Sequence, residues 1–157
     1  MKRYTVHPSD PYAGLFSDLF ILGTTRGAAG VSDFTAGATT QNFALLTPGN
    51  GDCVTYPLAQ AFTKIGFAGG ALSSVLLDVG FTNGSTFMLD QQMITLGAGG
   101  VSPLISGVGG PKNFDGVIGL TATIDTVGAN LSAITAGEIF IYVTLCRAVE
   151  FSTKLYG

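Results

Sequence analysis

The sequence predicts an all-β protein, either an antiparallel sandwich or a barrel, built as one domain. The chain has 157 residues, 46% of them apolar, which is enough for one domain with a substantial core. Seven or eight short segments show strand patterns, and turn-forming residues separate them. Only 11% of the residues are charged, and the chain contains 23 glycines and 6 prolines. This composition disfavours long helices and coiled coils, so alternating β–α units are not expected.

Residues 1–16 are predicted to form an extended arm in front of a single β domain that spans residues 17–157. They show no regular period, and Pro8 and Pro11 favour extended backbone. We expect the arm to be mobile or exchanged between subunits in the free protein, and to become ordered on a binding surface. Five of its side chains are candidate attachment residues: Tyr4, Val6, Tyr12, Leu15 and Phe16.

The first half of the domain contains five predicted strands. Their residues are rich in β-branched and aromatic side chains, or they alternate between apolar and polar. The five strands cover residues 18–23, 40–47, 53–58, 59–67 and 74–82. Pro57 marks an edge, a bulge or a strand start between the third and the fourth. In the fifth, Val75, Leu77 and Val79 share one face, which is the period of a strand.

The next segments are less regular. Asn83-Gly84 is the strongest hairpin signal of the chain. Residues 86–93 lack glycine and proline and carry good helix formers, which predicts one or two helical turns. Residues 97–116 are rich in glycine, serine and proline and are too long for a tight loop. Their length suggests that contact with a partner shapes them.

Two further strands are predicted near the end of the domain. Residues 116–126 alternate between aliphatic side chains and threonine, glycine or aspartate, which predicts a half-exposed strand. Residues 137–147 have Ile139, Ile141 and Val143 on one face and Phe140 and Tyr142 on the other. Because both faces are largely apolar, we expect this strand to lie centrally. Its second face should be covered by another layer or by a neighbouring subunit.

No pattern in the sequence specifies an active site. His7 is the only histidine, and no nucleophile and base pair surrounds it. The glycine-rich stretches match neither phosphate-loop signature, and the acidic residues are dispersed. Cys53 and Cys146 lack metal-ligand spacing, so we expect buried free thiols, with a disulfide as the alternative. We therefore expect no catalysis, no cofactor and no metal.

The aromatic residues favour core positions over a carbohydrate platform. The chain has no tryptophan, 11 phenylalanines and 5 tyrosines. Four of the phenylalanines fall inside strand patterns, where core positions are expected: Phe43, Phe67, Phe81 and Phe140.

Charge and hydropathy exclude two classes of partner. The net charge is −3, and the seven basic residues are dispersed, so the sequence lacks the basic patch of a nucleic-acid binder. No apolar stretch approaches the roughly 18 residues of a membrane-spanning helix. The first residues also lack the apolar stretch of an export signal. We expect no nucleic acid, no membrane and no export.

Residues 40–145 resemble small virion structural proteins of tailed bacteriophages, in particular capsid decoration or cement proteins. Three short elements carry the resemblance. A turn ending in Gly51-Asp52 opens a strand, and residues 77–80 (LDVG) precede a polar turn. A threonine-rich strand is then followed by a closing strand that residues 135–138 (TAGE) introduce. Residues 97–116 and 148–157 match no part of this pattern.

The resemblance implies a jelly-roll-like sandwich, usually a homotrimer at three-fold or quasi-three-fold positions of a capsid. Such a protein is made in the host cytoplasm, binds the major capsid protein and holds neighbouring capsomers together, without catalysis. Doubly apolar strands fit this role, because an obligate oligomer buries the surplus apolar surface. The expected function is therefore that of a capsid decoration protein on the virion surface. The alternative is a receptor- or glycan-binding domain of a phage fibre or spike, and an enzyme ranks third.

Overall fold

The structure is a computed structural model, and it describes residues 1–6, 15–24, 31–46, 53–54, 58–81, 87–94, 96–97, 105–108, 112–113 and 119–146. These residues form antiparallel strands and one 3-10 turn, η1 (Leu131–Ala133), so the prediction of an all-β protein is confirmed. The strands are β1 (Lys2–Val6), β2 (Leu15–Gly23), β3 (Thr40–Leu46), β4 (Cys53–Val54), β5 (Leu58–Ala68), β6 (Ser74–Phe81), β7 (Phe87–Met93), β8 (Ile105–Val108), β9 (Lys112–Asn113), β10 (Leu120–Val127) and β11 (Ala136–Cys146).

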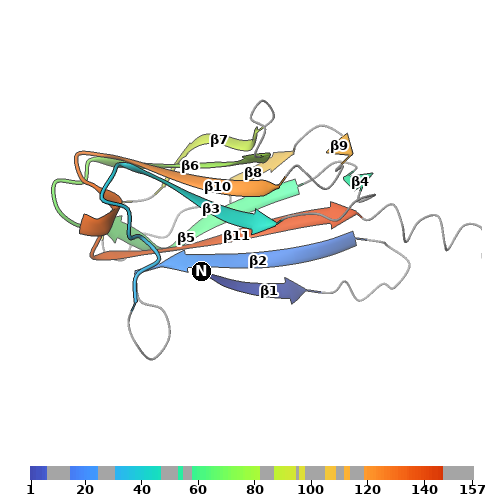
Figure 1. Cartoon of the computed structure of the whole chain (residues 1–157), viewed down its shortest axis with the longest axis horizontal. Coiled ribbons are helices and arrows are strands. Elements are labelled where there is room, and N and C mark those ends of the chain that lie inside the picture. Colours follow the sequence, from blue (N-terminus) through green and yellow to red (C-terminus); the bar gives the residue numbers. More distant parts are fainter. Residues whose placement is uncertain are drawn as a thin grey trace, which may run out of the picture.

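Two main sheets form two layers (Figure 1). One has five strands in the order β1-β2-β11-β5-β8, and the other has four in the order β3-β10-β6-β7. Strands β4 and β9 make a separate short pair. In chain order, the strands switch repeatedly between the layers: β1, β2, β5, β8 and β11 belong to the five-stranded sheet, and β3, β6, β7 and β10 belong to the other.

Strand β11 lies in the centre of the five-stranded sheet, as its two apolar faces predict. It pairs with β2 on one side and with β5 on the other. The threonine-rich strand β10 is likewise confirmed as half-exposed. Its residues alternate between buried and half-buried from Leu120 to Thr126, so one face meets the core and the other does not.

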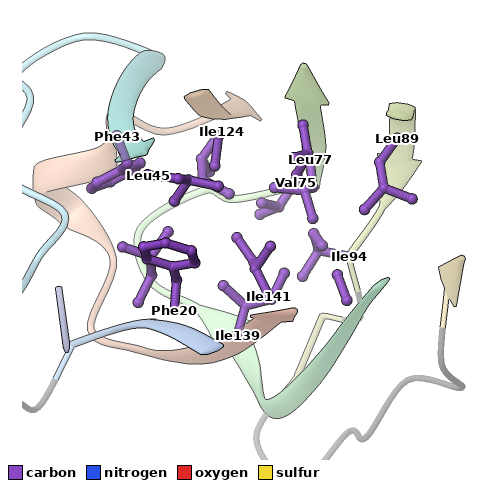
Figure 2. Close-up of a cluster of buried hydrophobic side chains, with 14 of the residues drawn as sticks. Phe20, Phe43, Leu45, Val75, Leu77, Leu89, Ile94, Ile124, Ile139 and Ile141 are labelled. Atoms are coloured by element: carbon purple, nitrogen blue, oxygen red, sulfur yellow. The ribbon is translucent and has the colours of Figure 1, made fainter. Parts of the chain in front are cut away.

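One hydrophobic core fills the space between the two sheets. Figure 2 shows Phe20, Ile139 and Ile141 from one sheet pointing toward Leu77 and Ile124 from the other. Each fully buried side chain of this size contributes about 1.5–3 kcal/mol relative to leaving it exposed. At one end of the core three aromatic rings meet: Phe34 lies 6.1 Å from Phe43 and 5.3 Å from Phe67, measured between ring centroids.

The helical turns predicted at residues 86–93 are wrong, because Phe87–Met93 is strand β7. It pairs with β6, and Leu89 lies opposite Val79 and is buried in the core. Burial against a neighbouring strand outweighs the weak helix propensity of this segment. The antiparallel pairing of β6 with β7 confirms the hairpin predicted at Asn83-Gly84, although the connecting residues 82–86 lie outside the described residues.

The long irregular stretch predicted at residues 97–116 contains two short strands, β8 and β9. Strand β8 extends the five-stranded sheet by pairing with the first half of β5, and its Gly107 lies opposite Ala59. A four-residue strand that includes a glycine has no alternation long enough to detect in a sequence.

The N-terminal arm is also different from the prediction. Residues 2–6 are strand β1, at the edge of the five-stranded sheet, and β2 begins at Leu15 rather than near Asp18. The two strands pair along the whole of β1, with Lys2 opposite Ile21 and Tyr4 opposite Leu19. Residues 7–14 lie outside the described residues.

Candidate interaction face

The outer face of the five-stranded sheet carries a continuous group of apolar side chains. In one cross-strand row, Lys2, Ile21, Phe140 and Phe62 follow one another from β1 to β5. In the next row the order is Tyr4, Leu19, Tyr142 and Gln60. On β2, β5 and β11 these residues alternate with core residues, so their side chains point away from the core, and on β1 Lys2 and Tyr4 lie on the same outer side. We call this group the aromatic face: Tyr4, Leu19, Ile21, Phe62, Phe140 and Tyr142.

Three rings pack against one another at the centre of the aromatic face. The centroid of Phe62 lies 5.0 Å from that of Phe140, at an interplanar angle of 54°. Its distance to Tyr142 is 6.3 Å, and these two rings are stacked at 20°. All three side chains remain half-buried, because only one side of the cluster contacts the sheet. Such tilted and stacked pairs contribute about 0.5–1.5 kcal/mol beyond burial of area.

The exposed fraction differs among the other side chains of the aromatic face and its surroundings. Ile21 retains only 9% of its surface, although it lies outside the core cluster. Tyr4, at the edge strand, is 49% exposed, and Ile65, beyond Phe62 along β5, is 43% exposed. The rim carries charges of both signs: Lys2 and Lys64 are exposed, and Glu138 is half-buried.

The outer face of the four-stranded sheet has the opposite character. The Thr123 hydroxyl donates to the Asn42 side-chain oxygen at 2.9 Å, and the Thr40 hydroxyl donates to the Asp125 carboxylate. Asn42 and Ala44 are exposed on β3. Polar groups that bond to one another across strands suit contact with water. The two outer faces therefore differ, and the aromatic one requires an explanation.

An ion pair joins the edge strand β1 to the core. The Arg3 guanidinium donates to the Asp18 carboxylate at 2.9 Å, where the Arg3 side chain is 48% exposed and that of Asp18 only 7%. The same guanidinium lies 5.6 Å above the ring centroid of Phe20, a core residue. Because Lys2 and Tyr4 point outward and Arg3 points inward, β1 both covers an edge of the core and extends the aromatic face.

The predicted attachment residues do not form one cluster in the described part of the chain. Tyr4 belongs to the aromatic face, next to Leu19. Val6, Leu15 and Phe16 are strand residues whose side chains lie outside the described residues, and so does all of Tyr12. The structure therefore places one of the five on a candidate surface.

Several members of the aromatic face could not be identified from the sequence. Phe43 and Phe67 lie in the core as predicted, but Phe140 does not, because it faces outward beside Phe62. The second apolar face of residues 137–147 was the signal that pointed to this surface. Leu19 and Phe62 lie in strands whose two faces are both apolar, so alternation alone cannot tell which face meets the core.

The described residues offer little chemistry beyond packing. Within the described ranges, no three His, Cys, Asp or Glu side chains come close enough together to hold a metal ion. None of the helical structure there is long and apolar enough to cross a membrane. The side chains of His7, Cys53 and Cys146 lie outside the described residues, so the expectation of buried thiols stays a prediction. An apolar centre with a polar rim is the arrangement typical of a protein–protein interface.

No family model, curated protein or solved structure matches this chain.

Proposed function

We propose that this chain is a non-enzymatic structural protein of a virion. It acts as a capsid decoration or cement protein of the tailed-phage kind, which forms a homotrimer, binds the major capsid protein and stabilises the shell. The observation that carries the proposal is the aromatic face. The central strand β11 is apolar on both faces, so it places rings on the outer surface of the sheet as well as aliphatic side chains in the core, and assembly would cover those rings.

We also propose that the fold is a jelly roll, and the strand pairing supports this. Apart from the edge strand β1 and the separate pair β4 and β9, the two sheets contain eight strands. The first of these pairs with the last, β2 with β11, and the second with the seventh, β3 with β10. The third and sixth, β5 and β8, also pair, and so do the two in the middle, β6 and β7. Such nesting is what results when one long hairpin rolls up into two sheets. Jelly rolls occur in viral capsid proteins and in lectins, so the fold is compatible with both functions considered.

A trimer suits the task of holding capsomers together. Closed three-fold symmetry repeats each attachment surface around an axis, so three weak contacts act on the shell at once. Linked contacts can exceed the affinity of a single one by a factor of about 10²–10⁴. The sequence resemblance to decoration proteins favours this use over other assemblies.

The test is to mix the purified protein with phage shells that lack decoration. We expect the protein to sediment with the shells in a saturable amount and to raise the temperature at which they break open. Shells incubated with an unrelated protein of similar size and charge provide the control. If the protein neither sediments with shells nor protects any of them from heating, the proposal is wrong.

One observation favours the alternative, a receptor- or glycan-binding domain. Tyr4 is exposed, and Gln60 follows Tyr142 in the same cross-strand row, so rings and an amide are neighbours on one sheet face. Aromatic rings stack on sugars, and an amide can bond to their hydroxyl groups. Binding of the intact protein to host cell-surface glycans, weakened by Tyr142→Ala, would support this alternative. In that case the intact protein should not sediment with shells that lack decoration.

A further inference from the structure

We infer that the aromatic face is the contact between copies of this chain and that a second copy is its occupant, rather than the shell. The inference deepens the proposed function, since it depends on the expected oligomer and assigns a surface to it. It also gives Tyr4 a different role: this residue becomes part of the subunit contact and no longer serves attachment to the shell.

The size of the aromatic face fits the centre of a standard interface. Strands lie about 4.8 Å apart, and side chains on one face recur about every 7 Å along a strand. Four strands and the two rows thus span a footprint of roughly 300 Å², of which Lys2 and Gln60 occupy two corners, against the about 800 Å² per partner of a stable contact. The patch therefore corresponds to the apolar centre, and the remaining area must come from the rim.

The charges on the rim favour a second copy over a partner of one sign. Lys2 and Lys64 are exposed on β1 and β5, while Glu138 lies on the same outer face of β11. A strongly acidic partner would bring like charge against Glu138, and a basic one against the two lysines. A second copy presents charges of both signs, so its carboxylate can face a lysine of the first copy and its lysines can face Glu138.

The rings themselves also suit such a contact. Phe62, Phe140 and Tyr142 already hold one another in place, so they lose little side-chain freedom when a partner covers them. Tyr4 is more exposed at the edge and supplies a ring with a hydroxyl group, the kind of residue enriched at binding hot spots. On the outer face of the other sheet, where Asn42 is exposed, the described side chains include no aromatic ring that could serve as a comparable anchor.

The first experiment uses fluorescence, because the chain has no tryptophan of its own. A Phe62→Trp variant places one indole in the aromatic face, and an Ala44→Trp variant places one on the exposed outer face of β3. We expect the indole at position 62 to emit in the blue, to resist acrylamide quenching and to become exposed on dilution. The indole at position 44 should be exposed at every concentration. An exposed indole at position 62 in concentrated protein overturns the inference.

The second experiment removes the anchor. We expect Phe140→Ser and, separately, Tyr142→Ser to convert the oligomer into monomers by sedimentation equilibrium, while Ala44→Ser leaves the mass unchanged. Circular dichroism and thermal melting identify any variant that fails to fold. If neither serine variant folds, the fluorescence of the Phe62→Trp variant decides whether the aromatic face is covered. An oligomer that survives both substitutions in folded protein, or a wild-type protein that is monomeric, overturns the inference. Shell binding is scored separately: protein that associates through this face but ignores shells contradicts only the proposed function.

Discussion

At the scale of single residues, the structure distinguishes side chains that alternate along the same strand. Ile139, Ile141 and Val143 of β11 are fully buried between the sheets, whereas Phe140 and Tyr142 face outward. A substitution at an odd position of β11 should therefore affect folding. A substitution at an even position should affect association.

Ile141→Asp tests the inner face. It places a carboxylate in the core without a partner, and the cost should exceed the few kcal/mol of net stability of a domain of this size. We expect the variant to be unfolded or insoluble by circular dichroism and light scattering. Ala44→Asp, which adds the same charge at an exposed position, should melt like the wild type. Soluble Ile141→Asp protein with a cooperative melt would refute the face assignment.

Gly137 is one of the glycines at which the fold leaves no room for a side chain. A Cβ atom there would lie 2.8 Å from the ring of Phe67, which is buried and packs against Phe34. We expect Gly137→Ala to destabilise the protein by about 1–3 kcal/mol, as overpacking in a core does. Gly37→Ala is the matched control, since a Cβ atom at position 37 would contact nothing within 4 Å. Urea unfolding compares the stability of the two variants. Equal midpoints would contradict the predicted clash between a side chain at position 137 and Phe67.

At the scale of elements, the edge strand β1 differs most from what the sequence predicts. Its residues are mostly polar or basic, and the pairing with β2 and the ion pair to Asp18 are contacts that no local pattern reveals. If residues 1–16 were only an arm in front of the domain, as the sequence predicts, their deletion would spare the fold. The structure indicates instead that the loss of β1 exposes one edge of the core and leaves the Asp18 carboxylate without Arg3.

Arg3→Gln measures how much this ion pair matters. Removing the cation leaves a carboxylate that is 7% exposed without its charged partner, and a fully buried pair broken in this way costs about 3–5 kcal/mol. Because Arg3 itself is half-exposed, water offsets part of that cost, and we expect a loss of about 1–2 kcal/mol. Lys2→Gln removes the same charge from the outer side of β1 and should cost less. Chemical denaturation at low protein concentration measures the free energy of unfolding of both variants. Equal losses of this free energy would argue against a role of the ion pair in stability.

The elements themselves show which patterns a sequence can reveal. Strands β6, β10 and β11 were predictable because each is long enough to alternate several times with a hydrophobic inner face. For strand β7 the local pattern predicts helical turns instead, because the burial that makes it a strand comes from β6, a tertiary neighbour. The aromatic face was half predictable: the second face of β11 pointed to it, but its extension to β1, β2 and β5 depends on a strand order that no local pattern encodes.

At the scale of the whole molecule, association should appear in the thermal stability. If the aromatic face joins copies and only folded chains associate, mass action stabilises the folded state. Each tenfold dilution then removes about 1.4 kcal/mol for every such contact. We expect the melting temperature in differential scanning calorimetry to fall on dilution for the wild type and to be independent of concentration for Phe140→Ser. A constant melting temperature for both would show that folding and association are not linked.

The central place of β11 also determines the order of events during synthesis. This strand is the last of the described strands to leave the ribosome, yet it must lie between β2 and β5, which are made much earlier. Until it arrives, those two strands have no neighbour on their facing edges, and open edges invite pairing with other chains. Nascent chains that stop before residue 136 should therefore remain sensitive to protease and bind chaperones, whereas chains from which β11 has left the ribosome should fold in one late step.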